Sequence, residues 1–121
     1  MMRVMVVEDE EMIRKGIVMA VDWAALDCIV VGEAANGEEG LAAAERYSPN
    51  LIITDVRMPR MDGIEMMRRL REKESTAHFI ILTAYDEFDY ARAALRYGAA
   101  DYLLKPFRDQ DLMSAIARVR E

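Results

Sequence analysis

Three carboxylates stand directly after short apolar runs of the chain. Glu8 and Asp9 follow the run Val4–Val7, and Asp55 follows the run Leu51–Ile53 after a single threonine. Carboxylates that lie close together repel one another and raise each other's pKa unless a cation joins them. A hard divalent cation such as Mg²⁺ prefers oxygen ligands and keeps places for waters and phosphate oxygens. These residue types predict a divalent-metal site if the fold brings the three together.

A hydroxyl and an ammonium group occupy the same kind of position. Thr83 ends the apolar run that begins at Phe79, and Lys105 follows the run Tyr102–Leu104. Lysine supplies a point charge for phosphate oxygens, and a threonine hydroxyl donates a hydrogen bond. An aspartate carboxylate is also a possible nucleophile that forms an aspartyl-phosphate. The residue types therefore indicate Mg²⁺-assisted phosphoryl chemistry on Asp55.

Five apolar runs alternate with five amphipathic patterns along the chain. The runs are rich in β-branched and aromatic residues and nearly continuous, which is typical of buried parallel strands. The patterns between them follow the three-or-four spacing of amphipathic helices. The predicted strands are Val4–Val7, Ile29–Val31, Leu51–Ile53, Phe79–Leu82 and Tyr102–Leu104, and the predicted helices contain residues 12–21, 41–47, 64–70, 88–95 and 112–119.

This alternation predicts an α/β fold in which helices cover both faces of a five-stranded parallel sheet. By analogy, the strand order is the flavodoxin-like 2-1-3-4-5, and ligands bind beyond the carboxyl ends of the strands. Asn36 with Glu39, and Asp62 with Glu65, are predicted helix N-caps. Gly98 is expected to be a left-handed residue after a helix.

The composition excludes several classes of protein. The chain has 121 residues, 16 basic and 22 acidic side chains, a net charge of −6 and one cysteine, Cys28. This length is typical of one domain, and a lone cysteine excludes a disulfide framework. The negative charge argues against a nucleic-acid surface. No apolar run approaches a membrane span, so a cytoplasmic domain without membrane contact is expected.

The sequence resembles the receiver domain of two-component response regulators. The resemblance extends over essentially the whole chain, from residue 1 to residue 121. The matching motifs are Val6-Val7-Glu8-Asp9, Asp55-Val56-Arg57-Met58-Pro59 with Asp62-Gly63, Thr83-Ala84, and Lys105-Pro106-Phe107, in the family's order and spacing.

The resemblance implies a role for each matching position. Asp55 would be the phosphoacceptor, and Mg²⁺ would be held by Asp9, Asp55, the backbone carbonyl of Arg57, and Glu8 directly or through water. Position 8 is Glu where Asp is commoner, and the longer side chain changes the reach of this ligand. The remaining implied contacts concern the phosphoryl group, which would be bound by Lys105, Thr83 and Ala84. The Lys105-Pro106 bond is commonly cis in this family.

The resemblance also implies a switch and its partners. A sensor histidine kinase would donate the phosphoryl group, and the face formed by the fourth helix, fifth strand and fifth helix would change and form a homodimer. Thr83, Tyr90, Tyr97 and Tyr102 are the residues assigned to that switch. The segment from Tyr85 to Ala91 and its continuation to Pro106 resemble receivers joined to AraC-type helix-turn-helix output domains.

An output domain of that type is expected to lie beyond this chain, so that DNA binding and transcription regulation would belong to an absent C-terminal part. A stand-alone receiver is the alternative.

Arg57 and Tyr85 occupy loop positions that the family associates with the lifetime of the aspartyl-phosphate. Because both side chains are bulky, the hypothesis is that they shield the acyl phosphate from water.

Three other functions compete with this interpretation. Haloacid-dehalogenase phosphatases also use an aspartyl nucleophile after a strand, but they carry a second acid where this chain has Arg57. A flavin or nucleotide binder needs a phosphate cradle, whereas the loop after Val7 is acidic. A pseudo-receiver usually lacks the acceptor or the lysine, and both Asp55 and Lys105 are present. The chain is therefore expected to be a regulatory phosphoacceptor rather than an enzyme.

Overall fold

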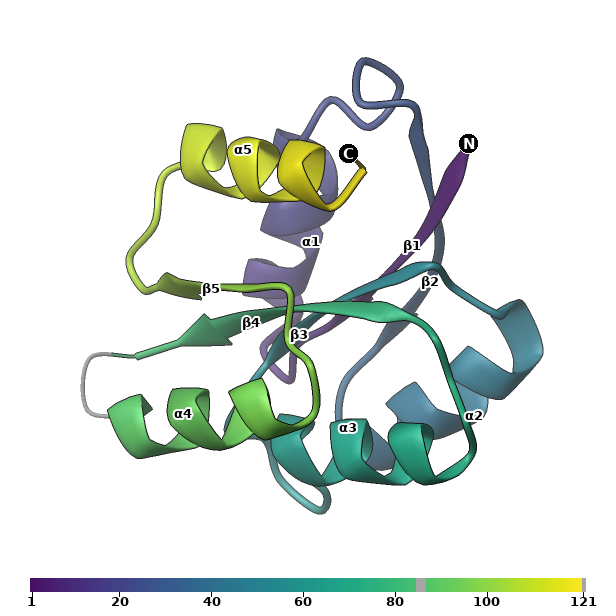
Figure 1. The fold of residues 1–121 in the computed structure, drawn as a ribbon. Helices are drawn as coiled ribbons and strands as arrows, with labels where there is room; N and C mark the ends of the chain where they lie inside the picture. The colour runs from purple at the N-terminus through teal and green to yellow at the C-terminus, as the bar shows by residue number, and fades with distance from the viewer. Residues whose placement is uncertain (85–86, 121) are drawn as a thin grey trace.

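The computed structural model describes residues 1–84 and 87–120, and it alternates strands with helices throughout (Figure 1). The strands form one parallel sheet in the order β2-β1-β3-β4-β5, which confirms the predicted topology. The elements are β1 (Met2–Val7), α1 (Glu11–Ala20), β2 (Cys28–Ala34), α2 (Gly37–Tyr47), β3 (Leu51–Asp55), α3 (Gly63–Glu72), β4 (His78–Thr83), α4 (Phe88–Arg96), β5 (Asp101–Leu104) and α5 (Asp109–Arg120).

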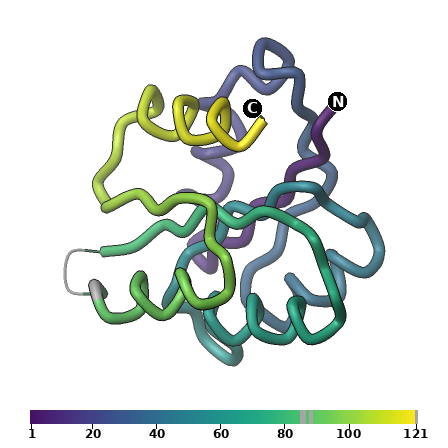
Figure 2. Tube along the Cα trace, viewed as in Figure 1, coloured from purple at the N-terminus to yellow at the C-terminus, as the bar shows by residue number. Residues whose placement is uncertain are grey.

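Two layers of helices enclose the sheet. Helices α1 and α5 cover one face, and α2, α3 and α4 cover the other (Figures 1 and 2). Strand residues that point to opposite faces enter two separate apolar cores, because successive side chains of a strand alternate. Met5 and Ile52 belong to the core under α2–α4, whereas Val4 and Leu51 belong to the core under α1 and α5. Burying this apolar surface is the main stabilising contribution to the fold.

The edge strand β5 differs from the expectation of burial on both faces, unlike the central strand β3. All five residues of β3 are buried, whereas residues of β5 alternate between half-buried and exposed. Leu103 packs into the core under α5, but its neighbours Tyr102 and Leu104 point to the other face and stay exposed. The reason is that α4 packs against β4 and leaves the outer edge of that face uncovered.

The predicted helix starts are confirmed. The Glu39 amide donates to Asn36 Oδ1 at 3.0 Å, and the Glu65 amide donates to Asp62 Oδ1 at 2.8 Å. Each cap satisfies an N–H group that has no partner within its helix. Gly98 has φ +80°, a left-handed conformation that glycine adopts without a Cβ penalty. The Asp62 cap lies between Asp55 and α3, so it also fixes the loop that follows Asp55.

Arg71 ties the end of α3 to neighbouring segments. Its guanidinium donates to the carbonyls of Tyr97 at 2.7 Å, Ser75 at 2.8 Å and Ala77 at 2.8 Å, and its carbon Cζ lies 4.8 Å from the centre of the Phe79 ring. Burial lowers the pKa of this guanidinium. One side chain therefore satisfies three carbonyl groups and covers an aromatic ring.

We expect Arg71→Ala to lower the free energy of unfolding by about 2–3 kcal/mol, because three carbonyls lose their donor at once. Urea titration followed by circular dichroism measures this change. Arg69→Ala on the same helix is the control, since the Arg69 side chain forms an ion pair with Glu65 at the surface. Its loss is expected to lower the free energy of unfolding by less than about 1 kcal/mol. Equal losses in the two variants would show that the Arg71 contacts do not stabilise the fold.

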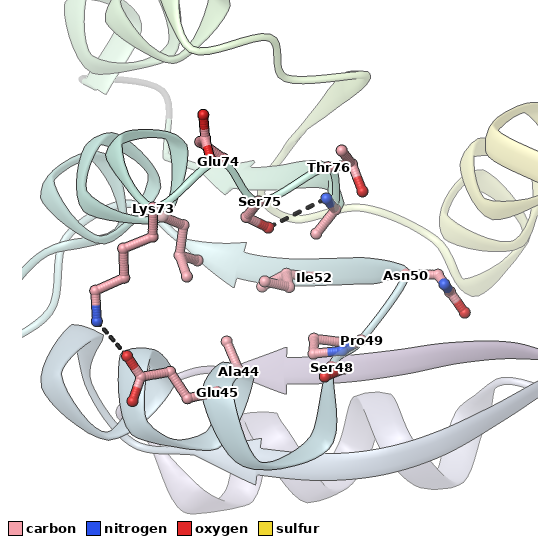
Figure 3. A pocket seen from close by; sticks show the side chains of 12 residues that line it. Ala44, Glu45, Ser48, Pro49, Asn50, Ile52, Lys73, Glu74, Ser75 and Thr76 are labelled. Carbon is pink, nitrogen blue, oxygen red and sulfur yellow. Dashed lines mark hydrogen bonds and ion pairs between the residues drawn. The ribbon is translucent and has the colours of Figure 1, made fainter.

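A hollow of about 440 Å³ lies where β3 and β4 begin (Figure 3). The side chains of Lys73 and Glu45 form an ion pair there between α3 and α2. The carboxyl ends of the same strands, where the predicted site lies, are at the opposite edge of the sheet.

Among the described residues, no helix is both long enough and apolar enough to cross a bilayer.

Candidate functional site

Four strands deliver the predicted site residues to one edge of the sheet. Asp55 and Thr83 are the last residues of β3 and β4, Glu8 directly follows β1, and Lys105 directly follows β5. Parallel pairing aligns these ends, with Val7 opposite Thr54, Asp55 opposite Leu82, and Thr83 opposite Leu104. The sheet topology therefore brings residues from positions 8 to 105 into one cluster.

The three predicted carboxylates meet at this edge. Ligand oxygens of Glu8, Asp9 and Asp55 all lie within 4.8 Å of one another. Glu8 is fully buried and Asp55 is 6% exposed, whereas Asp9 faces solvent. A cluster of oxygen donors with one open side fits a hard divalent cation that keeps several waters.

Lys105 joins two of these carboxylates. Its Nζ lies 3.2 Å from Glu8 Oε1 and 3.1 Å from Asp55 Oδ2. Burial opposes the positive charge, but Asp55 and Glu8 together raise the pKa of the Lys105 ammonium. The other carboxylate oxygen of Asp55, Oδ1, accepts a hydrogen bond from the Val56 amide at 2.9 Å. The Asp55 carboxylate is thus held in one orientation, with a cation beside it.

Burial, followed by contacts with Asp9 and Asp55, raises the pKa of the Glu8 carboxyl to about 8, although the nearby Lys105 lowers it. A buried carboxylate with acidic neighbours favours its protonated form, because the charged form loses water and gains repulsion. The cluster therefore holds more negative charge than its single lysine neutralises.

The raised pKa of Glu8 makes stability depend on pH. In the unfolded chain this group titrates near 4.5, whereas in the folded protein its pKa is about 8. Between these values the folded state binds more protons than the unfolded state, so the free energy of unfolding falls as pH rises. From about pH 5 to about pH 8, we expect the wild type to lose about 1–3 kcal/mol more than Glu8→Gln.

Urea titrations of the two proteins with a chelator present measure this difference. Gln cannot ionise, so the variant lacks the contribution of this group at every pH. The same pH slope in both proteins would contradict the account of Glu8.

Gly63 allows the loop after β3 to pack against Asp55. Its amide donates to the Val56 carbonyl at 2.8 Å, and a Cβ at this position would lie 2.3 Å from the Asp55 carbonyl oxygen. The Thr54 hydroxyl donates to that same carbonyl at 2.9 Å. The backbone around the carboxylate cluster is therefore fixed by close contacts that only glycine permits.

The predicted phosphoryl-binding groups at the end of β4, Thr83 and Ala84, already have partners. The Ala84 amide donates to Glu87 Oε1 at 2.9 Å. The Thr83 hydroxyl lies 3.3 Å from the Ala84 carbonyl oxygen and 3.4 Å from the Glu87 carbonyl oxygen. In this structure both groups therefore engage Glu87 at the start of α4.

Arg57 points its side chain toward the same residue. Arg57 Nε lies 3.6 Å from Glu87 Oε2, and Arg57 Cζ lies 5.7 Å from the centre of the Tyr90 ring. No contact tests the predicted metal-binding role of the Arg57 carbonyl, and Tyr85, its predicted partner in shielding the acyl phosphate, lies outside the described residues. The Lys105-Pro106 peptide bond is cis, as the resemblance implied.

The assigned switch residues occupy different environments. Tyr90 on α4 is 40% exposed and Tyr102 on β5 is 49% exposed, and Leu95 and Leu104 are exposed on the same two elements. Tyr97 instead packs against the core under α2–α4. The structure thus leaves an aromatic and apolar surface on α4 and β5. Tyr97 is not part of this surface, because its side chain packs against the core.

Glu87 is buried at the site, although its residue type predicts no role for it. An acidic residue at the start of a helix is common because of the helix dipole, so its type alone carried no signal. Its spacing from Thr83, one helical turn along the chain, is the feature that could have indicated contact.

Known proteins with similar sequences and structures share this arrangement of elements. The sequence model of the family described as "Response regulator receiver domain" matches residues 4–117. The uncharacterized transcriptional regulatory protein YesN of Bacillus subtilis strain 168 is 34% identical over 119 residues, which cover 98% of this chain and 32% of YesN. The chain spans 32% of YesN, 52% of the nitrate/nitrite response regulator protein NarL of Escherichia coli strain K12 and 46% of the transcriptional regulatory protein HptR of Staphylococcus aureus strain NCTC 8325.

Two solved structures extend the comparison to the fold. The REC domain of AraT, a response regulator from Geobacillus stearothermophilus, has a TM-score of 0.92 and 42% identity, covering 98% of this chain and 92% of that chain. A two component transcriptional regulator AraC from Clostridium phytofermentans ISDg has a TM-score of 0.91 and 31% identity, covering 99% of this chain and 93% of that chain.

Proposed function

Since this chain belongs to the response regulator receiver domain family, we propose that Asp55 accepts a phosphoryl group from a sensor histidine kinase. The observation that carries the proposal is the Asp55 carboxylate itself, which Val56 orients at Oδ1 while Lys105 contacts it at Oδ2. A fixed carboxylate beside a cation and an acidic cluster is suited to nucleophilic attack on phosphorus.

The transfer exchanges one bond to phosphorus for another. An Asp55 oxygen attacks the phosphorus, the new O–P bond forms, and the N–P bond of the phosphohistidine breaks. The leaving imidazole keeps the electron pair of that bond and takes up a proton. Lys105 lies beside the acceptor oxygen and stabilises the charge on the phosphoryl oxygens.

The carboxylate cluster fits Mg²⁺ by the chemistry of its donors. Glu8, Asp9 and Asp55 would hold the ion, together with the Arg57 carbonyl. When bound, Mg²⁺ neutralises negative charge that builds up on the transferring phosphoryl group. The ion would also relieve the repulsion that raises the pKa of Glu8.

The switch would follow from the new contacts of Thr83 and Ala84. A phosphoryl group on Asp55 offers these groups charged acceptors, which biases the equilibrium between two arrangements of α4 and β5. The exposed Tyr90 and Tyr102 would belong to a surface for a second copy of the domain. A cytoplasmic location and an AraC-type DNA-binding output domain complete the proposal, in keeping with the similar AraC regulator.

Incubation with acetyl phosphate and Mg²⁺ tests the proposal. Intact mass spectrometry is expected to show a gain of one phosphoryl group in the wild type and none in Asp55→Asn. Chelation of the metal is expected to suppress the gain. An unchanged wild-type mass, or a gain that persists in Asp55→Asn, would contradict the proposal.

A further inference from the structure

Glu87 engages Thr83, the last residue of β4, and Ala84, which follows it, and both would bind the phosphoryl group. Its carboxylate accepts the Ala84 amide hydrogen bond at 2.9 Å, and its backbone carbonyl lies 3.4 Å from the Thr83 hydroxyl. The side chain is buried, and its second carboxylate oxygen lies 3.6 Å from Arg57 Nε. One acidic residue therefore links the loops after β3 and β4 at the start of α4.

Glu87 occupies the N-cap position of α4, yet among the described residues its side chain makes no capping hydrogen bond to that helix. The carboxylate turns back toward Ala84 instead. A glutamate that accepts the backbone amide three residues before it makes the contact of the acid in a capping box, so the Ala84 amide is satisfied by the start of this helix itself.

We propose that the Glu87 carboxylate is a resident competitor of the phosphoryl group for the Ala84 amide, and that phosphorylation displaces it. The proposal rests on the function proposed above. An amide has one hydrogen to donate, so the carboxylate and a phosphoryl oxygen cannot both receive a full hydrogen bond from it. A phosphoryl group also carries nearly two negative charges and repels a neighbouring carboxylate.

Displacement of Glu87 would reach the exposed surface through Arg57. The Arg57 side chain contacts both residues: its Nε lies 3.6 Å from Glu87 Oε2, and its Cζ lies 5.7 Å from the centre of the Tyr90 ring. Once Glu87 leaves Ala84, this ion pair and the cation–π contact must rearrange together, which alters the position of Tyr90 on α4. Glu87 would then hold the unphosphorylated arrangement and set the free energy that phosphorylation must supply.

Binding of beryllium fluoride with Mg²⁺, a phosphoryl analogue, tests the competition. Glu87→Ala removes the carboxylate but keeps the backbone carbonyl near Thr83, so we expect half-saturation at a concentration about five- to tenfold lower than in the wild type. Phosphorylation by acetyl phosphate is expected to become faster in the same variant. Glu87→Gln keeps the shape of the side chain, so it should change in the same direction by a smaller factor.

Glu45→Ala is the matched control, because it removes an acidic partner of an ion pair at the opposite edge of the sheet (Figure 3). Its affinity for beryllium fluoride should equal that of the wild type. If the wild type is phosphorylated but neither Glu87 variant binds the analogue more tightly, the proposal about Glu87 is overturned while the proposed function stands. If no protein takes up a phosphoryl group, both fail.

Proton–nitrogen NMR of the Ala84 amide examines the contact directly. In the absence of beryllium fluoride, Glu87→Ala is expected to shift this resonance strongly, because the amide loses its charged acceptor. In the wild type, beryllium fluoride is expected to shift it as well. An Ala84 resonance that is insensitive to Glu87→Ala would overturn the proposal.

Discussion

Lys105→Met is expected to slow phosphorylation by acetyl phosphate by about a hundredfold, because it removes the cation next to the acceptor oxygen of Asp55. Methionine keeps much of the length of the side chain but has no charge to stabilise the phosphoryl oxygens. The rate of mass gain at saturating acetyl phosphate and Mg²⁺ measures the effect. A rate within threefold of the wild type would contradict the role given to Lys105.

The same variant tests the electrostatics of the cluster. Without Lys105, the buried carboxylates of Glu8 and Asp55 lose a cation that lies 3.2 Å and 3.1 Å away. Removing one partner of a buried ion pair costs about 3–5 kcal/mol of stability, and the loss is smaller where Glu8 takes up a proton. Because the cluster then lacks its internal cation, Mg²⁺ is expected to stabilise Lys105→Met more than it stabilises the wild type.

Thermal unfolding with and without Mg²⁺ measures this second effect. Lys73→Met is the matched control, since Lys73 forms an exposed ion pair at the other edge of the sheet. It should show the wild-type response to the metal.

Gly63→Ala is expected to lower the free energy of unfolding by about 3 kcal/mol. The new Cβ would meet the Asp55 carbonyl oxygen at 2.3 Å, and this neighbour is backbone that cannot swing away. Relief of the clash requires a shift of Asp55 or of the start of α3, and either shift disturbs the carboxylate cluster. The variant should therefore lose phosphorylation rate as well as stability.

Gly16→Ala provides a control with the opposite sign. A Cβ at Gly16 would have no heavy atom within 4 Å, and the residue lies within α1. Alanine in such an open helical position is expected to raise stability by about 0.5–1 kcal/mol. Urea titrations of both variants measure the contrast, and a Gly63→Ala protein as stable as the wild type would show that the loop relaxes freely.

The carboxylate cluster could be predicted because parallel strands end at one edge. Once the apolar runs are assigned to strands, residues that follow them must meet, whatever their separation along the chain. Glu8, Asp55 and Lys105 meet as expected. The helix caps at Asn36 and Asp62 could be predicted for a similar reason, because each depends on residues three positions apart.

Other features depend on packing that local patterns do not specify. The exposure of Tyr102 depends on α4 packing over β4 rather than over the sheet edge, and the burial of Tyr97 depends on the same placement. The contact of Glu87 with Ala84 depends on how the chain turns between β4 and α4. Hydrophobic periodicity describes which face of an element is buried, but not which neighbour covers it.

The position of the phosphoryl group is the most direct test of the central claim. Wild-type protein treated with acetyl phosphate and Mg²⁺ is reduced with borohydride, which converts an aspartyl-phosphate into homoserine, and the peptides are then sequenced by mass spectrometry. We predict homoserine at position 55 and unmodified acids at Glu8 and Asp9. Homoserine at another aspartate, or phosphate retained on a hydroxyl or histidine side chain, would contradict the assignment of Asp55 as the phosphoacceptor.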